Sequence, residues 1–243
     1  MKQALVTGGT RGIGAGVARS LADAGWSVIA ASASAAELDA FPSQDGITVA
    51  LLDVTDQASI DSLFATVSQL DGLVNCAGIL SRGQEYDIDI FTKVLDVNLT
   101  GTMRCCLAAQ PLLAKTSGAI VNTASMLSSF GGPLVPAYSA SKGGVSQLTK
   151  ALAGQWAEDN IRVNAIAPGW IETEMTQGLR EDRQRTDAIM ARTPMKRWGK
   201  PDEVGAPAAI PSLVVVLVGQ DRVRDRVISK GPFFCISPPF SYI

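Results

Sequence analysis

Tyr138 and Lys142 stand four residues apart, and Ser125 precedes the tyrosine by thirteen residues. If the segment that follows Pro136 is helical, positions four apart lie on the same face, so the Lys142 ammonium lies beside the Tyr138 hydroxyl. A free tyrosine has a pKa of about 10, and burial raises it, so a tyrosine that works near neutral pH needs a fixed positive neighbour. We therefore expect Lys142 to lower the pKa of Tyr138, and the three groups to form a proton-transfer site around one substrate oxygen. Taken alone, the Tyr138 and Lys142 pair is also typical of a solvated helix surface.

A glycine-rich stretch near the beginning of the chain has the pattern of a phosphate-binding turn. It extends from Thr7 to Gly14, follows an apolar strand predicted for Gln3 to Thr7, and precedes apolar residues at helical spacing. Glycines permit a tight turn and let backbone N–H groups approach a pyrophosphate, which the positive end of the helix dipole then stabilises. A purely structural glycine loop is the alternative, but a position between a strand and a helix favours nucleotide binding.

Five motifs, taken in order, resemble the short-chain dehydrogenase/reductase family. They are the glycine-rich stretch, the Asn-x-Ala-Gly stretch from Asn75 to Gly78, Asn98, Ser125, and Tyr138-x-x-x-Lys142. Three residues separate Gly8 from Gly12, which is similar to the short branch of that family. The resemblance covers the chain from about Lys2 to Ala209.

The resemblance implies a role for each of four catalytic residues. Tyr138 is the general acid/base, and Ser125 orients and polarises the substrate carbonyl. Lys142 also holds the nicotinamide ribose hydroxyls, and Asn98 holds a water that links Lys142 to solvent. The expected reaction is hydride transfer between a nicotinamide ring and a carbon that bears oxygen. The residues expected to bind the cofactor are Gly8, Thr10, Arg11, Gly12, Ile13, Gly14, Ser32, Asp53, Val54, Asn75, Ala77, Gly78, Tyr138, Lys142, Pro168, Gly169, Ile171 and Thr173.

The choice between NAD and NADP depends on the end of the second predicted strand. Family members that prefer NAD usually have an aspartate there, whereas this chain has Ser32. Without that carboxylate a 2′-phosphate is not repelled, and Arg11 in the glycine-rich stretch can pair with it. We therefore expect NADP to be favoured over NAD, although Arg11 as a solvated loop residue is the alternative. Asp53 resembles the family aspartate that contacts adenine.

The composition limits the possible partners. With 243 residues, 47% of them hydrophobic, the chain is long enough for one α/β domain with a substantial core. A net charge of -2 gives no basic stripe for nucleic acid, so we expect no nucleic-acid partner. The longest aliphatic run, Leu213 to Val218, is too short to cross a bilayer, so we expect no membrane partner. The expected partner is a small carbonyl or alcohol compound.

The chain has no histidine, and its four cysteines have neither the spacing of a disulfide framework nor that of a metal site. We therefore expect no metal ion and no histidine-based acid/base chemistry. Met1 leads directly into the first predicted strand without a secretion leader, so the cytoplasm is the expected location.

Short β-branched runs alternate with helical patterns, which indicates a parallel sheet joined by crossover helices. Apolar residues from Ile60 to Val67 have helical spacing with Asp56 placed to cap, and those from Val145 to Trp156 form another stripe. We expect a single Rossmann-like doubly wound α/β domain over residues 1–243, with helices on both faces and a cleft at the carboxyl ends of the strands. The strands are expected at Gln3 to Thr7, Ser27 to Ala31, Ile47 to Leu52, Gly72 to Asn75, Ala119 to Thr123 and Arg162 to Ile166.

The segment after Pro168 determines the substrate in this fold, and we expect residues 170–198 to form a substrate lid. An inward-facing arginine of the lid can bind a carboxylate, although solvated charges on a helix are the alternative. The phrases Ala124 to Ser128 and Leu179 to Asp182 are similar to sugar-acid dehydrogenases of the gluconate and ketodeoxygluconate type. The arginines of the lid are Arg180, Arg183, Arg185, Arg192 and Arg197.

The expected function is therefore NAD(P)-dependent oxidation or reduction of a secondary alcohol or ketone, such as a sugar acid or a related hydroxy compound. A 3-oxoacyl-carrier-protein reductase is the first alternative, but Ile79 to Arg82 departs from the Ile-Thr-Arg-Asp that often follows Asn-x-Ala-Gly in those enzymes. A non-catalytic cofactor-sensing or scaffold protein is the alternative of another class. The intact catalytic motifs argue against it.

Residues 210–243 depart from the family pattern, which typically ends with a strand and Val-Asp-Gly-Gly. A shifted reading frame in the gene would explain this tail, and an intact mass together with the nucleotide sequence would test it. Because the usual ending supplies a strand and a subunit contact, we expect a homo-oligomer, a tetramer or dimer, unless the tail prevents it. Leu213 to Val218 would then replace the usual strand.

Overall fold

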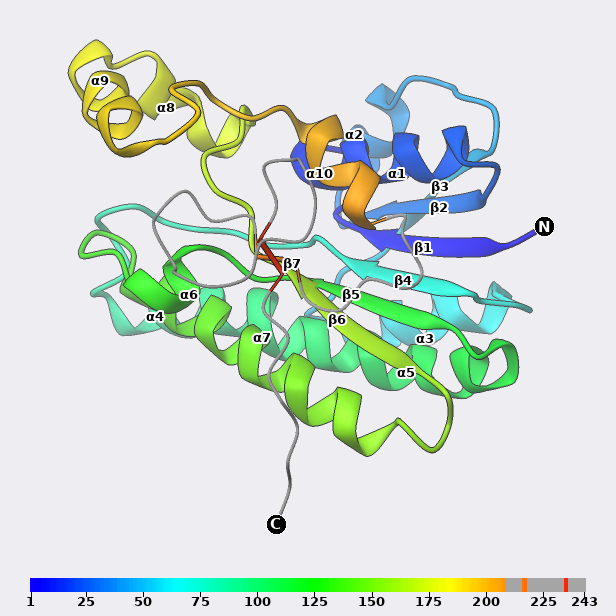
Figure 1. The fold of residues 1–243 in the computed structure, drawn as a ribbon. Coiled ribbons are helices and arrows are strands. Elements are labelled where there is room, and N and C mark those ends of the chain that lie inside the picture. The colour runs from blue at the N-terminus through cyan, green and yellow to red at the C-terminus, as the bar shows by residue number, and fades with distance from the viewer. Residues whose placement is uncertain (209–215, 218–233, 236–243) are drawn as a thin grey trace.

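A twisted parallel sheet lies at the centre of the protein, as the alternation of strands and helices predicts (Figure 1). The computed structural model describes residues 1–208, 216–217 and 234–235. The strand order is β3-β2-β1-β4-β5-β6-β7-β8, and the first six strands in the sequence are all parallel. These strands are β1 (Gln3–Thr7), β2 (Ser27–Ser32), β3 (Ile47–Leu51), β4 (Gly72–Asn75), β5 (Ala119–Thr123) and β6 (Arg162–Ile166). All six predicted strands are confirmed, with ends that differ by at most one residue.

Two short strands lie beyond β6. β7 (Val216–Leu217) pairs in parallel with β6, and β8 (Phe234–Cys235) pairs antiparallel with β7. β7 falls within the run from Leu213 to Val218 that was expected to replace the usual last strand. The rest of that run, and the rest of the tail, lie outside the described residues.

Helices cover both faces of the sheet, which confirms the doubly wound fold (Figure 1). α1 (Gly12–Asp23) and α10 (Pro201–Ala208) lie on one face, with α2 (Ala35–Ala40) beside β2 and β3. Glycine lets α1 and α10 pack closely, since a Cβ on Gly16 would lie 2.5 Å from the backbone carbon of Pro201. The other face carries α3 (Gln57–Thr66), α4 (Ile88–Leu95), α5 (Gly101–Thr116) and α7 (Pro136–Gln155).

Neighbouring residues of each strand pack into separate cores on the two faces, because successive side chains of a strand point in opposite directions. Leu5 and Leu73 belong to the core beneath α3, α5 and α7, whereas Val6 and Val74 belong to the core beneath α1. The strands are therefore apolar on both faces, as buried parallel strands must be.

The predicted helix signals also hold. α7 begins at Pro136, which needs no hydrogen bond for its nitrogen at that position. Asp56 caps α3 by accepting a hydrogen bond from the amide of Ala58 at 3.0 Å. No helix within the described residues is long and apolar enough to cross a membrane.

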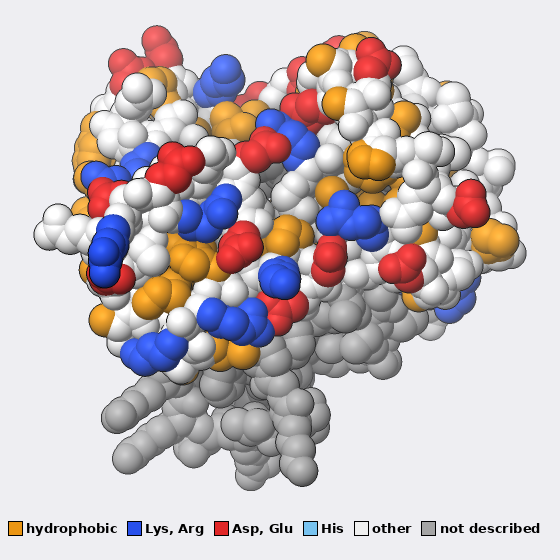
Figure 2. All heavy atoms as spheres, turned by 90° about the horizontal axis from the view of Figure 1, so that it is seen from above, with side chains coloured by type: hydrophobic (Ala, Val, Ile, Leu, Met, Phe, Trp, Pro, Cys, Tyr) orange, Lys and Arg blue, Asp and Glu red, His pale blue; other side chains and the backbone are white. Residues whose placement is uncertain are grey.

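Several short elements complete the edge where the strands end. A π-helical turn, η1 (Asp96–Thr100), joins α4 to α5, and α6 (Leu127–Phe130) follows β5. The predicted lid, residues 170–198, contains η2 (Glu174–Thr176), α8 (Gln177–Arg180) and α9 (Arg183–Arg192). Seen from above, on the side where Figure 1 has α1, α10 and the lid helices, acidic and basic side chains are interspersed (Figure 2).

Candidate active site

The glycine-rich turn between β1 and α1 is shaped for close approach of backbone atoms. Gly8 and Gly12 have φ angles of 61° and 49°, a left-handed conformation that favours glycine. A Cβ on Gly14 would lie 2.0 Å from the carbonyl oxygen of Gly8, so no other residue fits there. The turn also leads into a 12-residue helix with no acidic residue in its first turn. This backbone cradle fits the pyrophosphate of a dinucleotide.

The turn meets other segments that the sequence assigns to the cofactor. A Cβ on Gly8 would lie 2.9 Å from the backbone nitrogen of Ala77, and a Cβ on Gly12 would lie 3.2 Å from Cγ2 of Thr173. The Ala77 amide donates to the hydroxyl of Thr7 at 3.2 Å. Segments far apart in the sequence are thus brought together around the turn.

The structure brings Ser125, Tyr138 and Lys142 together, as their spacing predicts. Both α7 residues lie on one helix face, Lys142 buried and Tyr138 half-buried, and the Lys142 Nζ lies 5.6 Å from the centre of the Tyr138 ring. Ser125 follows β5, and its side chain forms a hydrogen bond with Tyr138. The Lys142 ammonium donates to the carbonyl oxygen of Thr123 at 2.6 Å.

Asn98 joins this group from the π-helical turn η1. Its side chain is fully buried, accepts a hydrogen bond from the amide of Ile79 at 2.8 Å, and donates to Ser141 at 3.0 Å. A Cβ on Gly78 would lie 3.3 Å from the Asn98 Oδ1 and 3.6 Å from the Lys142 Nζ. Asn98 and Lys142 therefore flank the backbone of Gly78, while the water held by Asn98 stays a prediction.

The expectation that Lys142 lowers the pKa of Tyr138 is wrong for this structure. Burial raises the pKa of Tyr138, the hydrogen bond with Ser125 opposes this rise, and the charge of Glu85 adds to it. Burial also lowers the pKa of Lys142 to about 8. The ammonium is directed to the Thr123 carbonyl instead of the phenol, so the protein alone keeps Tyr138 protonated. This is the form that can give a proton to a substrate oxygen.

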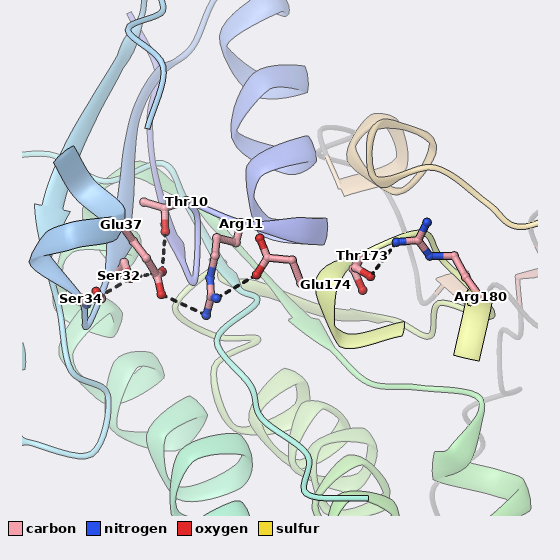
Figure 3. A network of polar contacts seen from close by, with 8 residues as sticks. All are labelled: Thr10, Arg11, Ser32, Ser34, Glu37, Thr173, Glu174 and Arg180. Carbon is pink, nitrogen blue, oxygen red and sulfur yellow. Dashed lines mark hydrogen bonds and ion pairs between the residues drawn. The ribbon is translucent and has the colours of Figure 1, made fainter. Parts of the chain in front are cut away.

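Glu37, which the sequence analysis missed, supplies a carboxylate near the end of β2. It accepts hydrogen bonds from the hydroxyls of Ser32 at 2.7 Å and Thr10 at 3.1 Å, and forms an ion pair with Arg11 at 3.0 Å (Figure 3). Arg11 also pairs with Glu174 at 2.9 Å, which links the glycine-rich turn to the lid. The end of β2 itself carries the uncharged Ser32, whereas this carboxylate comes from α2, five residues further along the chain.

Glu85 is a second carboxylate that the sequence analysis missed. It is fully buried, and it accepts hydrogen bonds from the backbone amides of Ser81 and Tyr138, both at 2.8 Å. It lies in a polar stretch without helical or strand periodicity, so no pattern in the sequence marked it.

Two of the other predicted cofactor residues form hydrogen bonds within the protein. Asp53 accepts hydrogen bonds from the amide of Thr55 at 2.8 Å and from its hydroxyl at 2.7 Å. Asn75 donates to Asn122 at 2.9 Å and so joins β4 to β5. Its Oδ1 is buried and has no hydrogen-bond partner among the described residues, which leaves an acceptor available.

The remaining predicted residues follow β3 and β6. Val54 packs against Gly101, where a Cβ would lie 2.7 Å from Val54 Cγ2. The carbonyl of Pro168 accepts a hydrogen bond from Met126 at 3.5 Å, and Gly169 follows it. Ile171 forms a parallel bridge with Gly199, which closes the lid segment at its base. All these residues lie beyond strand ends, where this fold binds its ligands.

Comparisons with known proteins agree with this geometry. A family model described as enoyl-(acyl carrier protein) reductase matches residues 8–210. The 2-dehydro-3-deoxy-D-gluconate 5-dehydrogenase of Pseudoalteromonas atlantica is 41% identical, over 85% of this chain and 87% of its own. The gluconate 5-dehydrogenase of Gluconobacter oxydans is 36% identical, over 84% of this chain and 85% of its own.

A solved structure shows the same fold. The gluconate 5-dehydrogenase of Burkholderia cenocepacia, in complex with NADP and tartrate, has a TM-score of 0.78 and 32% identity, and the match covers 86% of this chain and 87% of that one. The chain is therefore an NAD(P)-dependent oxidoreductase that belongs to the short-chain dehydrogenase/reductase family.

Proposed function

We propose that this enzyme interconverts a secondary hydroxyl and a ketone on a sugar acid. The observation that carries the proposal is the convergence of Ser125, Tyr138 and Lys142 beside the glycine-rich turn. The similarity to relatives named for gluconate and 2-dehydro-3-deoxy-D-gluconate supports the substrate class.

Each of the four polar groups has a task in this reaction. A bound nicotinamide ring supplies or accepts the hydride, which is chemistry that no side chain of the protein provides. Tyr138 gives its proton to the substrate oxygen in reduction and takes the hydroxyl proton in oxidation. Ser125 forms a hydrogen bond with the same oxygen. Lys142 binds the cofactor ribose, and Asn98 holds the water through which the proton passes between Lys142 and solvent.

Two arginines support an anionic substrate. Arg82 follows the Asn-x-Ala-Gly stretch, and Arg185 lies in α9. Burial lowers the pKa of Arg82, and the positive charge of the nearby Arg185 lowers it further. Two like charges close to each other favour binding of an anion, for which Arg185 would have to release Asp182, its ion-pair partner at 3.1 Å. We propose that they receive the substrate carboxylate, and that residues 170–198 form the lid that brings Arg185 to it.

For the cofactor, we propose that NADP is favoured over NAD, with Arg11 as the partner of the 2′-phosphate. The side chain of Arg11 is 57% exposed and so is accessible to a phosphate, and Ser32 adds no charge there. The relative from Burkholderia cenocepacia holds NADP. Glu37 opposes this preference, since Arg11 must release it to pair with a phosphate.

The test is to mix the purified protein with NAD or NADP and a panel of sugar acids, sugar alcohols, simple ketones and 3-oxoacyl thioesters. We expect absorbance at the nicotinamide band to change with sugar acids and not with acyl thioesters. Tyr138→Phe should abolish turnover and spare cofactor binding. Turnover of Tyr138→Phe at the wild-type rate would refute the role of the tyrosine.

The alternatives predict other outcomes in the same assay. A 3-oxoacyl-carrier-protein reductase would reduce the acyl thioesters, and a cofactor-sensing protein would bind NADP without turnover; the relatives favour neither. We further propose a homo-oligomer that works in the cytoplasm, which light scattering and cell fractionation would test.

A further inference from the structure

Glu85 is a buried carboxylate beside the proposed catalytic group, and none of the roles above uses it. It lies between β4 and α4 and is 0% exposed. Its Oε1 accepts from the amide of Ser81, and its Oε2 accepts from the amide of Tyr138. Both oxygens therefore bind backbone, one in the segment after β4 and the other at the beginning of the catalytic helix.

The Tyr138 amide is one of the first amides of α7, which have no acceptor within the helix. Val135 at the N-cap makes no side-chain hydrogen bond, and Pro136 follows it. Glu85 thus takes the part that an N-cap side chain usually has, although it lies 53 residues away in the sequence. A negative charge is favourable there because the N-terminus of the 20-residue helix is positive.

Two neighbouring contacts join the same pair of segments. The amide of Gly83 donates to the carbonyl of Leu134 at 2.7 Å, and the hydroxyl of Tyr86 donates to the carbonyl of Pro133 at 3.0 Å. Tyr86 is 76% exposed, so its hydrogen bond lies at the surface. Glu85 is the member of this set that reaches Tyr138 itself.

The charge of Glu85 matters as well as its reach. A buried carboxylate is unfavourable unless hydrogen bonds compensate it, and here two amides do so. The same charge raises the pKa of Tyr138 beyond the effect of burial. The other charged or titratable groups around these two residues are Lys142, Cys76, Arg82 and Arg185.

We propose that Glu85 is a positioning residue for the reaction: it anchors the first turn of α7 so that the phenol of Tyr138 faces Ser125, and it places a negative charge beside that turn. The proposal rests on the acid/base role given to Tyr138 above.

Two variants separate the reach of Glu85 from its charge. Glu85→Gln keeps the length and removes the charge, but its single carbonyl oxygen can replace only one of the two acceptors. Glu85→Asp keeps the charge and both acceptors and shortens the side chain. Tyr86→Phe is the matched control, because it removes the neighbouring surface contact. The measurements are kcat and KM, the pH profile of kcat/KM, and the ultraviolet titration of tyrosine phenolate, with Tyr138→Phe identifying the signal of Tyr138.

We expect Glu85→Gln to shift the ionisation of Tyr138 to lower pH, because the negative charge that opposes it is gone. We expect Glu85→Asp to leave that ionisation near its wild-type position but to lower kcat by about tenfold, with cofactor KM within about twofold, because the phenol is displaced. Tyr86→Phe should change none of these values by more than about twofold.

A folded Glu85→Gln with the wild-type titration of Tyr138 would overturn the part assigned to the charge. A wild-type kcat in Glu85→Asp would overturn the anchoring role assigned to the length of the side chain. An equal loss of kcat in Tyr86→Phe would overturn it as well. The titration needs no substrate, so it stays informative if wild-type protein turns over no sugar acid. Absence of sugar-acid turnover by the wild-type protein would count against the proposed function and not against the role of Glu85.

Discussion

The ammonium of Lys142 donates to the carbonyl oxygen of Thr123 at 2.6 Å, and this hydrogen bond ties the catalytic helix α7 to the end of β5. Lys142 is 4% exposed, so its charge is largely withdrawn from water. One carbonyl does not replace the hydration of an ammonium, and burial lowers the pKa of Lys142 to about 8. The enzyme therefore retains at its centre a charge that destabilises the fold.

Lys142→Met should reveal this penalty in the free energy of unfolding. The Lys142 pKa falls from 10.5 to about 8 on folding, so the folded state disfavours the charged form. At about 1.36 kcal/mol per pKa unit, the penalty is at most about 3 kcal/mol below pH 8 and disappears as the pH rises towards 10.5. Relative to wild type, Lys142→Met should gain more stability at about pH 7 than at about pH 10, as measured by urea unfolding. An equal gain in the free energy of unfolding at both pH values would contradict a penalty from the buried Lys142 charge.

Glu37→Gln should shift cofactor preference towards NADP. Glu37 now holds Arg11 and two hydroxyls, so a 2′-phosphate must displace a charged competitor. Removing its charge should lower the ratio of the NADP Kd to the NAD Kd by about tenfold, as measured by calorimetry without substrate. Glu174→Gln is the matched control, since it removes the other, more exposed partner of Arg11 and should change the ratio by less than about twofold. An unchanged ratio in Glu37→Gln would show that the phosphate binds elsewhere.

Arg82→Gln should weaken the binding of sugar acids but not of neutral ketones. Loss of one guanidinium from a carboxylate site should raise KM for the acid by about tenfold and leave kcat within about twofold. Arg183→Gln is the control from the lid, because its side chain is 96% exposed and pairs with Asp187 within the same helix. Equal effects of Arg82→Gln on charged and neutral substrates would contradict a carboxylate site.

The sequence predicted the sheet and the catalytic group because both depend on local patterns. Apolar runs mark buried strands, and a spacing of four places Tyr138 and Lys142 on one helix face. The strand ends then bring distant motifs to one edge, which is a property of parallel sheets and not of any single residue.

The two carboxylates that the sequence analysis missed act across the fold. Glu37 reaches from α2 to Thr10 in the glycine-rich turn, and Glu85 reaches from the segment after β4 to α7. Neither contact follows from periodicity, since each joins segments whose relative position is set by packing. The error about the pKa of Tyr138 has the same origin: spacing placed Lys142 on the correct face, but the Thr123 carbonyl determined where its ammonium points.

Gly14 and Gly154 allow two roles of glycine to be compared, close approach of backbone atoms and flexibility of a helix. A Cβ on Gly14 would lie 2.0 Å from the carbonyl oxygen of Gly8, so Gly14→Ala must open the turn that cradles the cofactor. We expect Gly14→Ala to abolish detectable cofactor binding and to lower the free energy of unfolding by about 1–3 kcal/mol. Gly154 in α7 is exposed, and a Cβ there meets nothing within 4 Å, so Gly154→Ala should add about 0.5 kcal/mol and leave cofactor Kd unchanged. Thermal unfolding and calorimetry of both variants provide the test, and tight cofactor binding by Gly14→Ala would show that the cofactor does not depend on this turn.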